Sequence, residues 1–490
     1  MRSEMQTTIH SRVTPEALTL AVVLIGFLAL PMSMSGTGVA LPQIGAELDA
    51  SGARVQWIVS AYFLTASAFM LVSGSLGDLL GRRRIYRVGS LLYVLGSIGS
   101  AAAPGIGLLL MARVVTGLGA AAIMAGGGAL IGANFSGKAR VRAFAAVGTT
   151  AGIGLAIGPT LSGWLVDGFG WRAGFAVFAA VGVILAAGTL LMRETRADHK
   201  ARVDWAGALV FIVALALFML TITQGANLGW FSAKMLLLIA VVLSLGAVFI
   251  AIERGAANPV LSLALFTSRR FVGWIVAAIT MSFAFGGVLA FLPTYLQGAA
   301  SYTAAQSGLV MLMPTAPMLV MPLVAGWLVN RGISVRTVIT VALAALAAGN
   351  FWLTTLHAGA TPVLLLGPLV TLGIGMGLAS GTIDAQAMND VLPSQTGMVA
   401  GLLNTVRGTT QALLLAIFGA GLIGVLTIAL GSPETAGRVA TGYVDSGAVH
   451  QVDALTTAWR LLLGAVGVFC ALGALVVFLL LCPASDASGK

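Results

Sequence analysis

The chain has 490 residues, of which 58% are hydrophobic and only 9% are charged, and its formal net charge is +10. A soluble protein of this size cannot bury so much apolar surface, whereas lipid covers that surface in a protein that crosses a membrane many times. The positive charge would suggest nucleic acid as a partner if it were gathered in one region. It is instead spread over short segments between apolar stretches, so it indicates membrane topology.

Apolar segments of about 20 residues, long enough to cross a bilayer as a helix, recur along the whole chain. The segment 398–429 is longer than a span requires, and we expect it to include loop residues. No signal peptide precedes the first apolar segment, which should therefore remain as a span. We predict fourteen transmembrane helices, near 17–41, 55–79, 86–105, 107–134, 143–166, 171–192, 204–224, 234–252, 271–297, 305–329, 336–356, 361–385, 398–429 and 457–482.

The positions of the 26 lysines and arginines test this count. Most of them fall in segments that lie on the same side as the two termini if all the predicted spans are real. The opposite segments contain only Arg54, Arg172, Lys234 and Arg438. Because basic residues collect on the cytoplasmic side of membrane proteins, both termini should be cytoplasmic.

Charge and glycine gather in the stretch GSLGDLLGRRR, which follows the second span. Its first two glycines would let two helices approach closely, and its aspartate could accept hydrogen bonds from an arginine or a helix N-terminus. The third glycine would turn the chain, and the arginines would anchor it among anionic head groups. Simple anchoring would explain the arginines but not the spacing of the glycines and the aspartate. We expect a conformational latch made of Gly74, Gly77, Asp78, Gly81, Arg82 and Arg83.

Two of the following spans carry unusual residues. Arg113 lies inside the span 107–134, where a charge is costly, so it should face a polar cavity or a partner; pairing with backbone carbonyls is the alternative. In the span 143–166, Gly154 and Gly158 share one face, and Pro159 removes a backbone hydrogen bond. We expect this face to contact the opposite half of the protein closely. An ordinary kinked packing helix is the alternative.

Two sequence patterns recur at similar positions in the two halves of the chain. GTTAGIGLAIG begins at Gly148 and GTTQALLLAIFG at Gly408, while GSLGD at 74–78 has a weaker copy, GWLVN, at 326–330. Both pairs relate helices eight apart in the predicted order, which indicates a parallel repeat of two six-helix bundles with two inserted helices. The expected domains are a cytoplasmic N-terminus (1–16), an N-terminal bundle (17–192), two linker helices (193–270), a C-terminal bundle (271–482) and a cytoplasmic tail (483–490).

Few acidic residues lie within the predicted spans, and Asp384 is the first choice for a group that takes up a proton there. Arg407 is its expected partner. The alternative is that Asp384 caps a helix end at the cytoplasmic surface. The four histidines fall in predicted loops or termini, which disfavours a histidine proton relay. Helix position suggests four polar residues that line a substrate cavity, namely Gln56, Tyr62, Asn404 and Gln411.

The stretch after the second span resembles the signature of the major facilitator superfamily, G-x-L-a-D-r-x-G-r-[RK], with Leu79 in place of its middle arginine. Fourteen helices arranged as six, two and six are similar to the drug:H⁺ antiporter-2 family. In the first span, Ser33 stands at the aspartate position of the family pattern and Gly38 at its asparagine position. Further matches are the family's helix 4 motif, at Arg113, Gly117 and Gly119, and its antiporter motif, at Gly154, Gly158, Pro159 and Gly163.

The resemblance implies an all-α secondary transporter of the bacterial inner membrane that exports a hydrophobic or amphipathic small molecule by proton antiport. It also implies a role for Arg113 near proton transfer. The expected partners are this substrate, protons and membrane lipids, without nucleic acid, cofactor, metal or catalytic residues, and the protein should be a monomer. The scarcity of acidic residues favours a neutral or anionic substrate. Because Ser33 replaces an aspartate, a proton-independent facilitator or lipid exporter stays open, as does a membrane sensor that does not transport.

Overall fold

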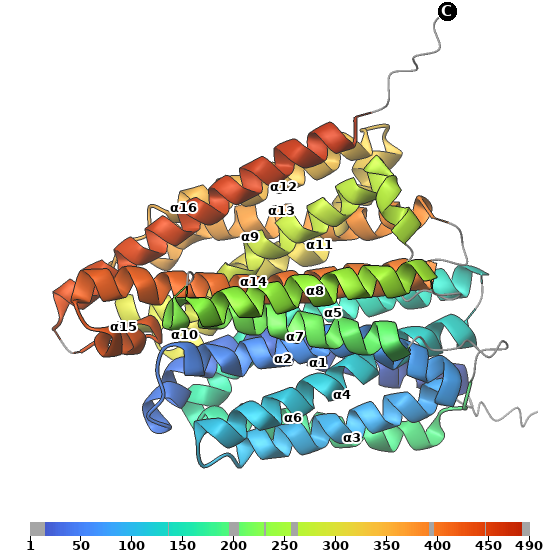
Figure 1. Ribbon diagram of the computed structural model, residues 1–490, viewed down its shortest axis with the longest axis horizontal. Helices are drawn as coiled ribbons and strands as arrows, with labels where there is room; N and C mark the ends of the chain where they lie inside the picture. Colours follow the sequence, from blue (N-terminus) through green and yellow to red (C-terminus); the bar gives the residue numbers. More distant parts are fainter. Residues whose placement is uncertain are drawn as a thin grey trace, which may run out of the picture.

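The structure is a computed structural model that describes residues 15–135, 137–195, 205–229, 232–255, 263–391, 396–445 and 447–482. Within these ranges the regular structure is entirely helical, and the long helices run side by side along the long axis of the molecule (Figure 1). Eleven spans in this part of the chain are long and apolar enough to cross a membrane.

The first helices form the N-terminal group, and their bounds agree closely with the predicted spans. The helix α1 is longer than its apolar core because polar residues continue it to Glu47, whereas Gly81 and Gly170 end α2 and α5 with positive φ values. The group consists of α1 (Pro15–Glu47), α2 (Ala53–Leu80), α3 (Arg82–Ala101), α4 (Ile106–Asn134), α5 (Gly137–Phe169) and α6 (Trp171–Gly188), followed by the short 3₁₀ helix η1 (Thr189–Leu191).

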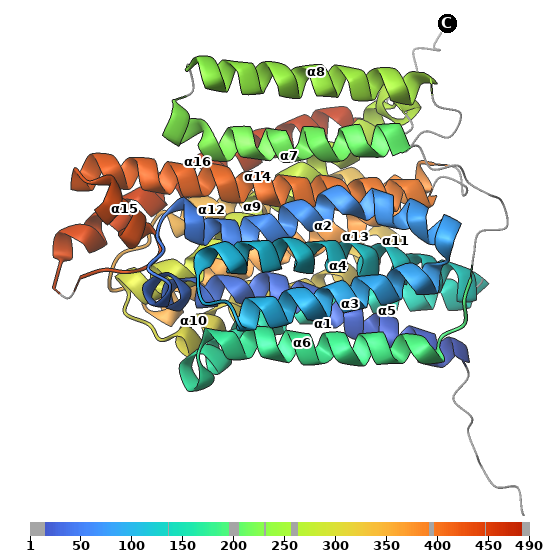
Figure 2. The ribbon, with the colours of Figure 1, turned by 60° about the horizontal axis from the view of Figure 1, so that its bottom comes forward.

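Two linker helices follow, α7 (Trp205–Leu228) and α8 (Ala233–Gly255). They pack against each other, and α7 also packs against α2 and α14. Figure 2 shows them at the edge of the molecule, with α8 outermost. Most of the side chains of α8 are exposed and apolar, as expected for a helix that faces lipid.

The remaining helices form the C-terminal group. Here one expectation needs correction. The segment 398–429 contains no loop, because α14 is one continuous helix. The segment 305–329 is confirmed as one apolar span, within which the helix is interrupted at Met311. The group consists of η2 (Leu263–Thr267), α9 (Arg269–Ala299), α10 (Ala304–Val310), α11 (Leu312–Asn330), α12 (Val335–Leu353), α13 (Pro362–Asn389), α14 (Thr396–Leu430), α15 (Pro433–Ala440) and α16 (Val449–Leu480).

Packing within the two groups follows the repeat seen in the sequence. The helix α5 packs against α1 and α10, and α14 packs against α9 and α2. Likewise α3 contacts α4 and α6, while α12 contacts α13 and α16. Each pair corresponds to its counterpart when the predicted helices are shifted by eight. The structure therefore has the packing that the predicted parallel repeat requires.

The two groups meet tightly near one end of the molecule, which we call the closed end and which carries residues 48–52, 170 and 300–303. There Gly38 of α1 lies against α9, where an added Cβ would come 2.7 Å from the carbonyl oxygen of Ala290. The amide of Gln297 also donates to the carbonyl of Val39 at 3.0 Å. A larger residue at position 38 would force α1 and α9 apart, which explains glycine there.

Candidate functional site

Asp384 and Arg407 form an ion pair that joins α13 to α14, as the sequence suggested. The guanidinium Nη2 donates to Oδ1 at 2.6 Å and Nη1 donates to Oδ2 at 3.2 Å, so the pair is bidentate. Asp384 lies inside α13, which continues to Asn389. The geometry therefore favours pairing over the alternative in which Asp384 caps a helix end.

The ion pair is only partly shielded from solvent. The Asp384 side chain is 41% exposed and the Arg407 side chain is 22% exposed. The Nε of Arg407 is buried and has no hydrogen-bond partner. Among the residues that the structure describes, Asp384 is thus the charged group that holds this arginine, and a change in its charge would release Arg407.

An apolar chamber of about 640 Å³ borders the neighbouring face of α14. Its volume lies within the range of about 300–1,000 Å³ that is usual for small-molecule sites. The hydroxyls of Thr405 and Thr409, which line it, have no hydrogen-bond partner. The chamber is lined by Phe211, Leu215, Phe249, Ile279, Phe283, Leu402, Thr405, Val406, Thr409, Thr410, Leu413, Ile417 and Phe469.

The four residues expected to line a substrate cavity are not brought together. Gln56 is buried where α2 meets Gly419 of α14, and Tyr62 is fully buried within the N-terminal group. Asn404 is exposed, and Gln411 packs against α9. None of the four lines the chamber described above. The sequence placed these four residues on helices, but it did not show which way the side chain of each one points.

Arg113 is fully buried in α4 and has no carboxylate partner among the described residues. Its Nε donates to the carbonyl of Ile58 at 3.0 Å. Its guanidinium carbon lies 4.5 Å from the ring centroid of Tyr62 and 5.5 Å from that of Phe175. The bond to Ile58 matches the alternative in which Arg113 pairs with backbone carbonyls, and the two rings add cation–π contacts.

The basic stretch after α2 is held by Glu194, which the sequence did not single out. The backbone N–H of Arg83 donates to Glu194 Oε1 at 3.0 Å, and Arg84 Nε lies 3.8 Å from Oε2. Gly81 turns the chain with a φ of +114°, a conformation that favours glycine. Since Glu194 follows η1, these contacts tie the start of α3 to the end of α6 within the N-terminal group.

Gly74 and Gly77 of the predicted latch do not have the close helix contacts that we expected for them. An added Cβ at Gly74 would meet no atom within 4 Å, and at Gly77 it would meet only Arg82, at 3.8 Å. The close helix approach expected at these two glycines is thus not present in this conformation. The side chain of Asp78 lies outside the described part of the structure.

The glycines of α5 divide between two neighbours. An added Cβ at Gly154 or Gly158 would overlap α1, which belongs to the same group. Gly163 and Pro159 instead lie against α10 of the C-terminal group, where Gly163 faces Ala304. The expectation that the face of Gly154 and Gly158 meets the opposite half is therefore wrong. The helix α5 lies between α1 and the C-terminal group, where it meets α10 and also α11, whose Thr315 hydroxyl donates to the carbonyl of Ala156 at 3.4 Å.

Asp167, near the end of α5, makes the main polar contact between the groups at the closed end. Its Oδ1 accepts from the backbone N–H of Ala304 at 3.2 Å and its Oδ2 from that of Ala305 at 2.9 Å. Two turns earlier, the hydroxyl of Thr160 donates to the carbonyl of Gly308 at 2.9 Å. In the sequence, Asp167 directly follows the predicted span 143–166, and nothing there indicates its distant partner.

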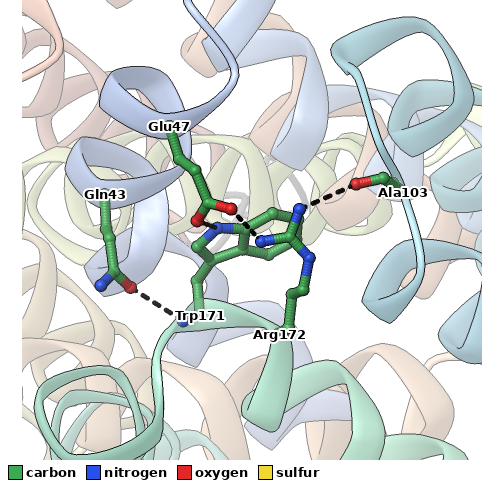
Figure 3. Close-up of polar contacts among 5 residues, drawn as sticks. All are labelled: Gln43, Glu47, Ala103, Trp171 and Arg172. Carbon is green, nitrogen blue, oxygen red and sulfur yellow. Dashed lines mark hydrogen bonds and ion pairs between the residues drawn. The ribbon is translucent and has the colours of Figure 1, made fainter.

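A second polar cluster at the closed end lies within the N-terminal group (Figure 3). The indole Nε1 of Trp171 donates to Glu47 at 2.6 Å, and its backbone N–H donates to Gln43 at 2.8 Å. Arg172 pairs with Glu47 and also donates to the carbonyl of Ala103 at 3.1 Å. This cluster joins the end of α1, the turn before α4 and the start of α6 into one unit.

Comparison with known proteins identifies the family. Residues 23–415 match the sequence profile of the Major Facilitator Superfamily. The multidrug resistance protein Stp of Mycobacterium tuberculosis is 32% identical over 417 residues, which cover 85% of this chain and 77% of Stp. The drug efflux pump JefA of the same organism is 31% identical over 420 residues, which cover 84% of this chain and 81% of JefA.

Solved structures agree in fold. A POT family transporter in complex with 5-aminolevulinic acid superposes with a TM-score of 0.67 at 13% identity, covering 94% of this chain and 95% of that chain. The nucleoside transporter NupG gives a TM-score of 0.63 at 14% identity and covers 94% and 100% of the two chains. The chain therefore belongs to the Major Facilitator Superfamily, and it is a multi-pass membrane transporter related to drug efflux pumps rather than an enzyme.

Proposed function

We propose that the chain is a fourteen-helix exporter of the drug:H⁺ antiporter-2 type, which moves an amphipathic small molecule out of the cell in exchange for protons. In this proposal α2, α3 and α7 cross the bilayer together with the eleven apolar spans. Both termini are cytoplasmic, and the two bundles occupy 17–192 and 271–482. The distribution of basic residues supports this orientation.

The observation that carries the proposal is the ion pair between Asp384 and Arg407. A proton that enters the partly exposed carboxylate neutralises it and frees Arg407, so the contact between α13 and α14 depends on protonation. The helix α14 also lines the apolar chamber and packs against α2 through Gly408 and Ser67. A change at the ion pair thus reaches both a site that fits a ligand and the contact between the two groups.

The closed end is the outer face in the proposed orientation. The contacts of Asp167, Thr160 and Gln297 then hold the exporter closed toward the outside. Alternating access requires these contacts to break while the opposite ends of the groups approach each other. The basic stretch at Arg82 and Arg83, now tied to Glu194, lies at that opposite end.

Two features support a lipophilic substrate. The chamber between α7, α8, α9, α14 and α16 is almost entirely apolar, and the relatives Stp and JefA are named for drug resistance and drug efflux. Among the described residues that line the chamber, none has the acidic side chain that an organic cation would require. We therefore favour a neutral or anionic amphipathic compound.

Purified protein in proteoliposomes tests the proposal, with the neutral dye N-phenyl-1-naphthylamine as a first probe and an imposed pH gradient as the drive. We expect gradient-driven flux in the wild type and a loss of at least about tenfold in Asp384→Asn. Asp390→Asn is the matched control, because Asp390 follows the end of α13, six residues after Asp384, and pairs with Arg270 at 3.1 Å, away from Arg407. It should retain coupling.

Each contrary result has a defined meaning. Flux that ignores the gradient in the wild type would show a facilitator or lipid exporter and overturn the antiport proposal. Full coupling in Asp384→Asn would instead show that the proton is carried elsewhere. If a varied panel of neutral and anionic compounds binds to the protein but none of them is transported, the result would favour a sensor.

A further inference from the structure

A closed polar cluster lies in the middle of the N-terminal group, away from the ion pair at Asp384. Five helices contribute to it. The side chains of Arg113, Tyr62 and Tyr93 are at most 1% exposed. The other contributors are Ser33 of α1, which lies beside the Tyr93 hydroxyl and is also buried, and Phe175 of α6.

The polar atoms of this cluster lack partners. Among the described residues, the Nη2 of Arg113 and the hydroxyls of Tyr62 and Tyr93 are buried and have no partner within hydrogen-bond distance, and the Ser33 hydroxyl is the polar group beside that of Tyr93. The Nε of Arg113 is satisfied by the carbonyl of Ile58. Buried polar groups are normally hydrogen-bonded, so three such groups in one place require an explanation. All three are able to donate, which means that an acceptor would complete them.

The positive charge of Arg113 strengthens the need for a partner in this cluster. A guanidinium that is removed from water without a counter-charge is one of the costliest arrangements in a protein. The faces of Tyr62 and Phe175 offset part of this cost through cation–π contacts. No carboxylate among the described residues pairs with Arg113. The missing component is therefore negatively charged as well as an acceptor.

The close packing of the helices around the cluster limits the size of the missing component. An added Cβ at Gly117 would come 2.8 Å from the carbonyl oxygen of Tyr62, and one at Gly119 would come 2.5 Å from the backbone nitrogen of Tyr93. Within two turns after Arg113, α4 is thus in close contact with α2 at Gly117 and with α3 at Gly119. A bulky ligand does not fit between helices packed in this way.

We propose that this cluster binds one small monovalent anion, which neutralises Arg113 and accepts hydrogen bonds from its Nη2 and from the hydroxyls of Tyr62 and Tyr93. The ligand is a halide or the carboxylate of a small organic acid, since both present one negative charge in a small volume. The bound anion joins α2, α3 and α4. The proposal concerns binding alone and stands or falls separately from proton-coupled export.

The first experiment measures binding to the full chain in nanodiscs, in a sulfate buffer whose divalent anion is not the proposed ligand, by scintillation proximity with [³⁶Cl]chloride and with [¹⁴C]acetate. We expect saturable binding of at least one of them, and the tighter ligand identifies the source of the charge. Tyr93→Phe should weaken binding about tenfold, because it removes one hydrogen bond to a charged ligand. Tyr86→Phe is the control on the same helix: its buried hydroxyl donates to the carbonyl of Val22, outside the cluster, and binding should not change.

The second experiment replaces the anion with a built-in carboxylate. Ser33→Asp places a negative charge beside Tyr93, and we expect it to abolish saturable anion binding. Ser33→Asn has the same size without the charge and should retain binding. Wild-type protein that binds neither chloride nor acetate would overturn the proposal. Anion binding by Tyr93→Phe that equals binding by the wild type would also overturn the proposal. This second test does not depend on whether the Ser33 variants fold.

Discussion

Replacing Asp167 by asparagine tests whether the closed end holds the two groups in this conformation. The carboxylate accepts two backbone N–H bonds, from Ala304 at 3.2 Å and Ala305 at 2.9 Å. Asparagine keeps one acceptor oxygen, but its amide N–H₂ would face the second donor. A hydrogen bond to a charged group contributes about 1.5–3 kcal/mol. Because Asp167 is exposed, we expect a loss of about 1 kcal/mol, which shifts the ratio of closed to open molecules about fivefold.

Distance measurements between spin labels provide the assay. Cysteines at Phe169 of α5 and Leu309 of α10, both well exposed, carry the labels in a background without Cys482. The population with longer distances should rise in Asp167→Asn. Glu47→Gln is the control, since it weakens the cluster of Figure 3, which lies at the same end but within one group. Unchanged distances in Asp167→Asn, or an equal shift in Glu47→Gln, would refute the reasoning.

Three further outcomes are expected. Gly158→Val should lower thermal stability by about 1–3 kcal/mol because its side chain would overlap α1, whereas Gly74→Ala, with no atom within 4 Å, should change it little in the same unfolding assay. Glu194→Gln removes the charged partner of Arg84 and should make limited trypsin cleavage after the arginines of this stretch several-fold faster; equal rates would contradict the role of Glu194. Burial raises the pKa of Tyr302 above its usual value of 10.0, so the stability that its protonated form contributes is present below pH 10.0 and is lost as the pH rises through the raised value. Near-ultraviolet titration of the wild type against Tyr302→Phe checks this shift.

The helices were predictable because lipid imposes one simple requirement on them. A span must be long and apolar, and the polar residues that separate the spans mark where each one ends. The bounds of α2, α4 and α8 accordingly differ from the predicted spans by a few residues. The helix α15 (Pro433–Ala440) was not predicted, since its eight residues are too few for a span and include the charged Glu434 and Arg438. The continuity of α14 was missed for the opposite reason, because its extra length exceeds what a span requires.

The faces of the helices were much harder to predict. In a soluble helix the apolar stripe marks the buried face, but a membrane helix is apolar all round. Nothing in the sequence therefore showed that Gly154 faces α1 or that Asn404 is exposed. Asp384 and Arg407 were paired correctly because charged residues are so rare in the spans that few partners exist. Glu194 was missed because it lies beyond the predicted spans, more than a hundred residues after the arginines that it holds.

The counterpart helices α5 and α14 show that the repeat is not mechanically symmetric. Each crosses from its own group to the other, but α5 contains Pro159 where it reaches α10, whereas α14 is a helix of 35 residues for which no internal proline is found. A proline removes one backbone hydrogen bond and allows a helix to bend, while an unbroken helix moves as a rod. In Figure 1, α14 extends along most of the molecule. In the proposed exporter, a displacement at Arg407 would be transmitted along α14 to its contact with Gln56 of α2, whereas α5 would bend at its proline. On the proposed function, coupling should depend on α14 more than on α5, and the placement of the ion pair and the chamber on α14 agrees with this difference.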